Sequence, residues 1–558
     1  MDPLPSAGLP GLGASLAGLS IALGLIAAFL AVGFGLPAQL PLQAASWLTF
    51  LAVVVTPGYL LGELVTWRLD LDLLERLALA MPLGVAVMAV PGLVAMLGHL
   101  TLEDLAVGWT LTVGGVIALW FIHRLLLRKD SQRAISPTWR WSDFAMLLLL
   151  VAAFVYVFPT LSLYKMDGDA YAVATFTSDA LTGHPLNATE PILGTGRSMG
   201  SIRMGMNQLL PVFHLWTYFS GADHIELLGT ASRSMLALWA ILAAYMLGKA
   251  AGGGSRRVGF LTASIQMLVY LAAPFVRADH VSIFFFERTN ADKFTVTVTM
   301  LPVVAALAIR YVSTASQDTM IARATWLAAA LAAFAVSSIH ALIAAMLALA
   351  LAAFGALHLL VNLRHRQAWI RVTGLALLTV IQMIMPLVQL YESLSGEALA
   401  PTYPASFEGW PLEERPMPIL PSELTTRFPS AFPTHQIAGL DVYGPLPDLA
   451  YLDAEQVNSP TNPFLIWRFA LNMRRQRIIV FDLERYISNP TLILEPPYLL
   501  ALLLLPFLLV RFRSDPGAQF CLSASLAVLF VLFNPILTPI LGALVMPWIL
   551  WRFVWLLP

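Results

Sequence analysis

The sequence has few charged residues and a single cysteine. Asp, Glu, Lys and Arg make up 12% of the 558 residues, whereas about a quarter is usual for a globular protein. A water-soluble protein of this length needs more polar side chains to cover its surface, so the composition excludes a soluble enzyme. The lone Cys521 excludes a disulfide framework and a thiolate metal cluster. A formal net charge of −1 gives no overall field to attract DNA or RNA, so we expect no nucleic-acid partner.

Apolar residues are abundant instead, at 58% of the chain with a mean hydropathy of +0.76. They occur in runs of about 20 residues, the length that crosses a hydrocarbon core of roughly 30 Å as a helix. The runs lack the alternation of a membrane β-barrel. The sequence therefore predicts an all-α polytopic membrane protein with about 13–14 transmembrane helices. The expected spans are residues 12–34, 45–66, 76–97, 104–125, 142–163, 228–249, 258–276, 294–312, 323–340, 341–362, 370–390, 496–511, 518–535 and 541–556.

Lys and Arg in the short loops predict the orientation of these spans. The richest cluster lies between the fourth and fifth runs, and placing it in the cytoplasm fixes the other loops by alternation. Four further groups of cations then fall on the same side, and the N-terminus is also cytoplasmic. We expect a multi-pass protein of the plasma membrane. The five clusters are Arg124 to Arg140, Lys249 to Arg257, Arg310 with Arg323, Arg364 to Arg371, and Arg511 with Arg513.

The charge pattern divides the chain into four parts. Residues 1–140 form an N-terminal four-helix membrane appendage, and residues 141–390 form a membrane core with an outer loop at 164–227. Residues 391–495 form an extracytoplasmic loop, and residues 496–558 contain the C-terminal helices, which we expect to be truncated. Short apolar segments predict a juxtamembrane helix at 208–220 and an amphipathic helix at 462–487.

Two acidic motifs lie where the orientation places the outer face. The first, YKMDGDAY, contains Asp167 and Asp169, and the second, FFFERTNADKF, contains Glu287 and Asp292. Cations accompany both motifs, although outer membrane-proximal segments are usually poor in them. Simple interfacial ion pairs are one explanation. The other is a shared site in which a carboxylate acts as a base and the cations bind an anionic substrate.

In its motifs the chain resembles the C-type membrane glycosyltransferases (GT-C fold), in particular the branch of protein mannosyltransferases and lipid A aminoarabinose transferases. That family opens its first outer loop with Asp-Glu-x-x-Tyr, and here Asp167 and Tyr171 keep the spacing while the second acid, Asp169, is displaced by one position. The family continues with a juxtamembrane helix, an Arg at the head of the next helix, and later a short outer loop with an Asp. Tyr218 to Gly221, Arg233 and Asp292 match these features.

The resemblance implies a transferase that uses a polyprenyl-phosphate-linked sugar as donor and a lipid, glycan or protein as acceptor. Asp167 or Asp169 would be the general base, with Asp292 positioning the acceptor or supporting the base. The candidate substrate-binding residues are Tyr171, Arg203, Arg233, Glu287, Arg288, Lys293, Arg474 and Arg475. The resemblance requires no metal or other cofactor. A Mg²⁺ or Mn²⁺ ion on the oxygens of Asp167, Asp169 and Asp292 is the alternative.

Two other functions stay open. A transporter or flippase for lipid-linked anions would place ionisable residues near the bilayer midplane, whereas the acids here cluster at one face. A catalytically inactive scaffold of the same fold would explain motifs that depart from the family pattern.

Overall fold

The structure is a computed structural model. It describes residues 12–126, 168–189, 205–272, 291–315, 318–395, 496–545 and 547–556, with short stretches at 435–437, 440–442, 478–480, 486–488 and 490–494 and single positions 145, 148, 152 and 191. Within these residues, seven helices are long and apolar enough to cross a membrane. Shorter apolar helices accompany them, and the predicted span at 142–163 lies almost wholly outside the described residues. The chain is an α-helical, multi-pass membrane protein.

The N-terminal helices follow the predicted apolar runs closely. They are α1 (Leu12–Gly33), α2 (Leu42–Phe50), α3 (Thr56–Thr66), α4 (Leu73–Leu97) and α5 (Leu102–Leu126). A 3₁₀ turn, η1 (Leu36–Gln39), follows α1, and a π-helical turn, η2 (Leu51–Val55), joins α2 to α3 in one continuous span.

Glycines bring α3 and α4 into close contact. A Cβ atom added at Gly58 would lie 1.8 Å from the carbonyl oxygen of Ala80, and one added at Gly84 would lie 2.1 Å from that of Val54. Small residues of this kind let the backbones of membrane helices approach each other. The pair α3 and α4 therefore forms a tightly packed unit.

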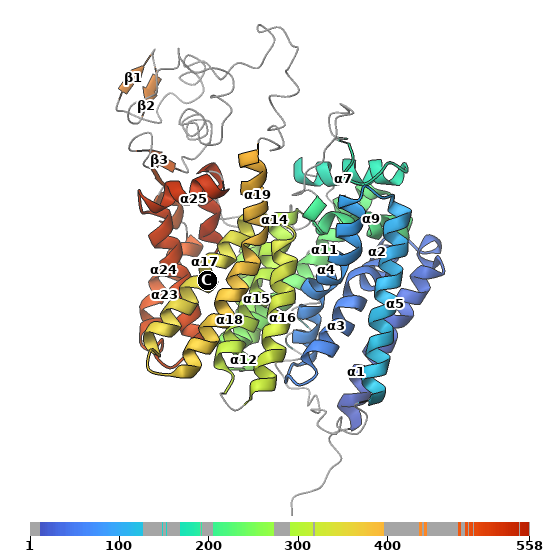
Figure 1. The fold of residues 1–558 in the computed structure, drawn as a ribbon, viewed down its shortest axis with the longest axis horizontal. Coiled ribbons are helices and arrows are strands. Elements are labelled where there is room, and N and C mark those ends of the chain that lie inside the picture. The colour runs from blue at the N-terminus through green and yellow to red at the C-terminus, as the bar shows by residue number, and fades with distance from the viewer. Residues whose placement is uncertain are drawn as a thin grey trace, which may run out of the picture.

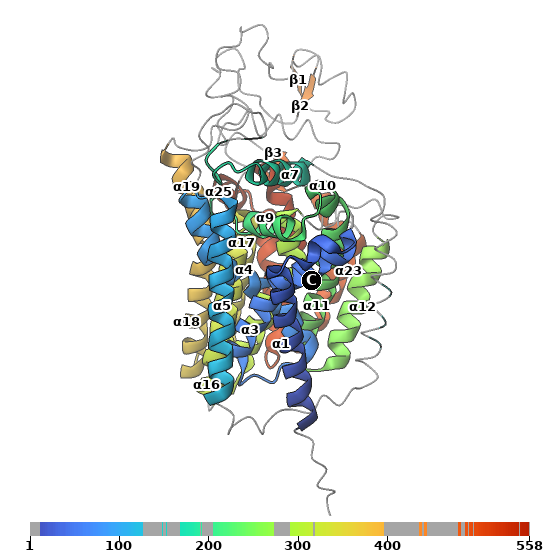
Figure 2. The same ribbon diagram turned by 90° about the vertical axis from the view of Figure 1, so that its right-hand side faces the viewer.

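Two helices lie across the upper end of the bundle, as Figures 1 and 2 show, while the long helices run up and down. They are α7 (Gly168–Leu181) and α9 (Leu209–Ser220), both from the predicted outer loop. Helix α9 coincides with the predicted juxtamembrane helix. Its residues from Leu209 to Thr217 are all buried, because it packs on α2, α4 and α5.

The central helices run between the N-terminal and C-terminal parts of the chain (Figure 1). Two of them contain a π-helical turn near the upper end, η4 (Leu227–Ala231) before α11 and η7 (Val296–Met300) before α15. The elements are α10 (His224–Glu226), α11 (Ser232–Ala251), α12 (Arg256–Ala272), α14 (Asp292–Thr295), α15 (Leu301–Ser313), α16 (Thr319–Ser337), α17 (Ala341–Val361), α18 (Arg366–Gln382) and α19 (Ile384–Ser395).

The C-terminal part differs from the prediction at one point. Helices α23 (Pro496–Leu509) and α24 (Pro516–Leu532) match expected spans. The last expected span, 541–556, is instead divided into α25 (Leu537–Val545) and the 3₁₀ helix η11 (Pro547–Leu556). Pro547 has no N–H to donate, which suits the first position of a new helical segment. Proline alone does not end a helix here, because α4 continues through Pro82 and Pro91.

The predicted amphipathic helix at 462–487 is wrong over its final part. Residues Ile478–Val480 form strand β3, which pairs antiparallel with β4 (Tyr486–Ser488). The β-branched sequence Ile-Ile-Val favours an extended conformation. A second small hairpin joins β1 (His435–Ile437) to β2 (Leu440–Val442), and η10 (Pro490–Leu494) leads into α23.

Buried apolar side chains from α1 through η11 form one continuous hydrophobic core. Helix α4 is central to it, since it packs against α3, α11 and α16. The cations predicted to share one side lie at the lower end of this bundle, opposite α7 and α9. Arg124, Lys249, Arg310 and Arg371 make contacts there, and α24 begins beside Ala251. The membrane side that this end faces stays a prediction.

Candidate functional site

The first acidic motif lies at the start of α7. Asp167 is outside the described residues, and Asp169 belongs to the first turn of the helix. Tyr171 follows in the next turn and is exposed. Helix α7 is held on α9 by a contact of 3.0 Å between Thr177 Oγ1 and His214 Nδ1. Tyr171 is therefore open to solvent on α7, two residues after Asp169.

The second acidic motif begins α14, also at the upper end (Figure 1). The Asp292 carboxylate accepts a hydrogen bond of 2.6 Å from the backbone N–H of Lys293. Lys293 is only 9% exposed, and its Nζ lies 6.0 Å from the centre of the Phe294 ring. A buried lysine suits an anionic ligand, because low solvent exposure strengthens the electrostatic attraction.

Arg233 lies on the neighbouring element and is 2% exposed. It is the second residue of α11, two positions after η4 ends at Ala231, while Lys293 lies in α14, three positions before η7 begins at Val296. Helix α11 packs against both η4 and η7, so the two π-helical turns lie in adjacent elements. Single π turns inside α-helices occur often at functional sites, since the extra residue redirects side chains.

An additional cation at this end was not predicted. Arg552, on η11, lies 5.7 Å from the ring centres of both Trp551 and Trp555. Trp555 in turn contacts Phe294 with a centroid separation of 5.1 Å, which brings η11 against α14. The run WILWRFVWLLP was interpreted as a membrane span, and that interpretation missed the contact between its Trp555 and Phe294 of α14.

Several predicted site residues lie outside the described part of the chain. The structure brings the beginnings of α7 and α14 to the same end of the bundle (Figure 1). Among the described residues, no group of three or more His, Cys, Asp or Glu side chains could hold a metal ion. The alternative of a bound Mg²⁺ or Mn²⁺ ion stays a prediction, because Asp167 lies outside the described residues. The other predicted site residues outside them are Arg203, Glu287, Arg288, Arg474 and Arg475.

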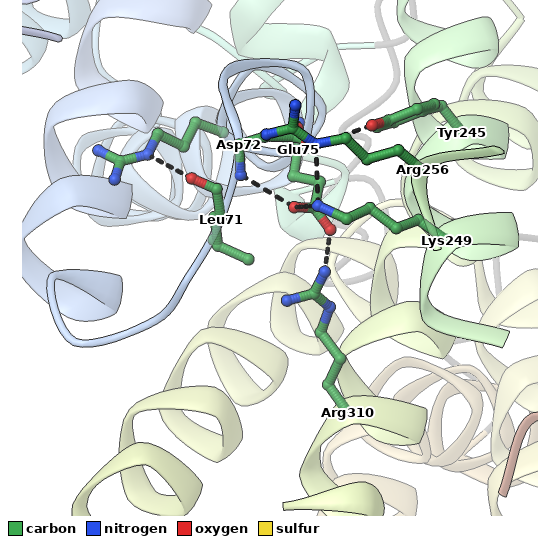
Figure 3. Close-up of polar contacts among 8 residues, drawn as sticks. Leu71, Asp72, Glu75, Tyr245, Lys249, Arg256 and Arg310 are labelled. Atoms are coloured by element: carbon green, nitrogen blue, oxygen red, sulfur yellow. Dashed lines mark hydrogen bonds and ion pairs between the residues drawn. The ribbon is translucent and has the colours of Figure 1, made fainter. Parts of the chain in front are cut away.

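The lower end contains an ionic network that the sequence analysis missed (Figure 3). Asp72 caps α4 and accepts a hydrogen bond of 3.0 Å from the Glu75 N–H, and the Glu75 carboxylate accepts one of 3.0 Å from the Asp72 N–H. Lys249 Nζ donates to both carboxylates, at 2.8 Å to Asp72 and 2.6 Å to Glu75. Arg310 also pairs with Glu75, whose side chain is fully buried. The network thus joins α4, α11 and α15.

Asp72 also contacts the side chains of Tyr245 at 2.7 Å and Arg256 at 3.5 Å. Burial alone raises the pKa of the Asp72 carboxyl. The positive charge of Lys249 and the hydrogen bonds from Lys249, Glu75 and Tyr245 outweigh burial, so the pKa lies below its usual value. Asp72 is therefore an anion at neutral pH.

A second group of charges adjoins the first on α3, α4 and α5. The Glu63 carboxylate pairs with Arg76 at 2.9 Å and with Arg124 at 2.7 Å, and it accepts a hydrogen bond of 2.8 Å from Trp120 Nε1. Acids thus lie at both ends of the bundle, whereas the sequence analysis expected them to cluster at one face of the membrane. The capping pattern Asp-x-x-Glu at 72–75 and the lone Glu63 in an apolar run were the available sequence signals.

Comparisons of the chain with protein-family models, with curated proteins and with solved structures found no match.

Proposed function

We propose that the chain is an integral membrane glycosyltransferase whose active site lies at the upper end of the bundle, on the extracytoplasmic face of the plasma membrane. It would move a sugar from a polyprenyl-phosphate-linked donor to a lipid, glycan or protein acceptor. The polyprenyl chain is anchored in the bilayer, so the sugar-phosphate lies where lipid meets water. The upper end, with its crosswise helices α7 and α9, is the place in this fold where such a donor could be received.

One observation supports the proposal most. Arg233 and Lys293, both buried, lie beside adjacent π-helical turns, and Asp292 hydrogen-bonds to the backbone of Lys293. Transfer of the sugar leaves a phosphate, and nearby cations stabilise the negative charge that develops on it. Buried cations do this more effectively than exposed ones, because water does not screen them.

The carboxylates supply the second part of the chemistry. Asp169, or Asp167 immediately before α7, would remove the proton from an acceptor hydroxyl or amine as that group attacks the anomeric carbon. Asp292 would position the acceptor or support the base. General-base catalysis of this kind contributes about 10²–10⁴ in rate. The N-terminus would then be cytoplasmic, with the ionic network on the cytoplasmic side.

The test is reconstitution of the purified chain in vesicles with a polyprenyl-phosphate mannose donor, then with the glucose and aminoarabinose donors. Release of polyprenyl phosphate is the measurement. We expect turnover to fall about 10²–10⁴-fold in Asp167→Asn or Asp169→Asn. Asp179→Asn is the matched control, because Asp179 lies on α7 but pairs with His184 at 2.6 Å. Unchanged turnover in Asp167→Asn, Asp169→Asn and their double variant would overturn the base assignment.

A transporter or flippase for lipid-linked anions is the second candidate. The observation in its favour is Glu75, a fully buried carboxylate paired with Lys249 and Arg310 at the end opposite the acidic motifs. Ionisable residues inside membrane proteins often mark transport pathways. The same vesicles distinguish the candidates. A flippase moves the intact donor between leaflets and releases no polyprenyl phosphate, and an inactive scaffold does neither.

A further inference from the structure

Glu63, at the lower end of the bundle, pairs with two arginines at once. One carboxylate, only 5% exposed, serves two guanidinium groups, Arg76 and Arg124, whose side chains are each 33% exposed. The three groups together have a net charge of +1. Arg76 directs its Nε to the carbonyl oxygen of Leu71 at 3.1 Å, so part of its hydrogen-bonding capacity is used within the loop.

In the described part of the chain, Arg124 uses fewer of its hydrogen-bond donors than Arg76 does. Its described polar contact is the 2.7 Å ion pair from one terminal nitrogen to Glu63, and its guanidinium lies 5.4 Å from the centre of the Trp120 ring. A guanidinium carries five N–H donors in a planar fork, which matches the geometry of a phosphate. The Arg124 side chain is 33% exposed, so a phosphate can approach it from outside the cluster.

The surroundings of Arg124 are those of a membrane interface. The last turns of α5 expose Ile122, Leu125 and Leu126, large apolar side chains that face away from the bundle. Helix α5 is the least buried of the seven long apolar helices, with 28% of its apolar window buried. The exposed Trp67 ring lies next to His123, with a centroid separation of 5.7 Å. Exposed Trp residues are typical of the headgroup level.

The adjacent loop, residues 67–70, contributes no net charge to this end of the bundle. Arg68, which lies 4.3 Å from the centre of the Trp67 ring, and Asp70 are both exposed and have opposite charges. Within the described part of this end, Arg76 and Arg124 with Glu63 therefore supply the excess positive charge. Cationic pockets between membrane helices on the cytoplasmic side bind anionic lipid headgroups.

We propose that Arg124, with Arg76, forms a binding site for the phosphate of an anionic phospholipid, whose acyl chains lie along the exposed apolar face of α5. The apolar surface directly beside the cations favours a lipid over a free phosphate, because a free phosphate would gain nothing from Ile122 and Leu126. The site is independent of sugar transfer, since it lies at the opposite end of the bundle from α7 and α14.

The test is native mass spectrometry of the full chain in detergent, titrated with palmitoyl-oleoyl phosphatidylglycerol. We expect Arg124→Gln to weaken binding about fivefold, the ratio that corresponds to about 1 kcal/mol per cation near the membrane surface. Arg124→Lys keeps the charge and should lose less. Arg366→Gln is the matched control, because Arg366 is an exposed cation that begins α18.

Four results would overturn the proposal. The first is equal affinity for palmitoyl-oleoyl phosphatidylcholine, which would leave only apolar adsorption. The second is equal weakening by Arg366→Gln, which would indicate a general surface charge effect. The third is competition by glycerophosphate as strong as that by the lipid, which would indicate a free-phosphate site. Thermal unfolding of each variant in the same detergent separates loss of binding from loss of the fold, and a folded Arg124→Gln with wild-type affinity also refutes the site.

Discussion

Arg310, in the last turn of α15, pairs with Glu75, in the first turn of α4, across 235 residues of sequence. Glu75 is fully buried and has Lys249 as a second partner at 2.6 Å. A buried carboxylate between two cations holds three helices in one arrangement. Replacing Glu75 by a neutral residue therefore weakens the contacts among α4, α11 and α15.

We expect Glu75→Gln to destabilise the protein by about 1–3 kcal/mol, because Arg310 loses its carboxylate partner and the buried Lys249 keeps only Asp72 among the described acids. The measurement is the thermal unfolding midpoint in detergent. Glu103→Gln is the control, since Glu103 is an exposed acid in the first turn of α5. A midpoint for Glu75→Gln as high as that of Glu103→Gln would mean that the network contributes little to stability.

The packing of α3 on α4 gives a second prediction. Gly58→Ala would force a Cβ atom to 1.8 Å from the Ala80 carbonyl oxygen, a backbone atom that cannot move alone. We expect a loss of at least about 1–3 kcal/mol from overpacking. Gly114→Ala is the control and should slightly stabilise the protein. A Cβ atom at Gly114 meets nothing within 4 Å, and alanine favours the helix. Equal midpoints for the two variants would contradict the close approach of α3 and α4.

The sequence predicted the long helices well because their apolar runs are set by the thickness of a membrane. The expected spans 12–34, 104–125 and 341–362 correspond to α1 (Leu12–Gly33), α5 (Leu102–Leu126) and α17 (Ala341–Val361). The crosswise position of α9 also followed from a run too short to span. These features depend on local composition, which a single sequence displays directly.

The features that the sequence did not predict depend on distant partners. Nothing local in Glu75 indicates that Arg310 will be its partner, and nothing in the run Leu227–Ala231 indicates a π-helical turn rather than an α-helical one. In a π-helical turn each backbone N–H bonds to the carbonyl five residues back instead of four. Packing against other helices decides which of the two forms. The division of the last span at Pro547 does not follow from the proline alone, since α4 runs through Pro82 and Pro91.

His214 provides a prediction of pH dependence. It lies in α9, outside the long apolar helices, and burial lowers its pKa to about 3. Below a pH of about 6.5 the unfolded chain binds a proton at this position while the folded chain does not, so the free energy of unfolding decreases as the pH falls. The decrease is about 1.4 kcal/mol per pH unit until the pH approaches the folded pKa.

We therefore expect the unfolding midpoint to fall between about pH 6.5 and pH 5, and His214→Gln to reduce that fall, because glutamine does not titrate. His184→Gln is the matched control for removing a histidine from the upper end, since His184 is an exposed histidine just after α7. A wild-type pH dependence in His214→Gln would show that other groups cause the acid sensitivity.

The orientation of the bundle can be tested with two histidines at its opposite ends. His184 follows α7 at the upper end and His365 caps α18 at the lower end, and both are exposed. In a Cys521→Ser background, an impermeant maleimide should label His184→Cys in intact cells and His365→Cys only after the membrane is permeabilised. This result follows if the cationic lower end is cytoplasmic. The reverse labelling would place α7 and the candidate base in the cytoplasm, where an extracytoplasmic acceptor cannot reach them, and would contradict the proposed site of sugar transfer.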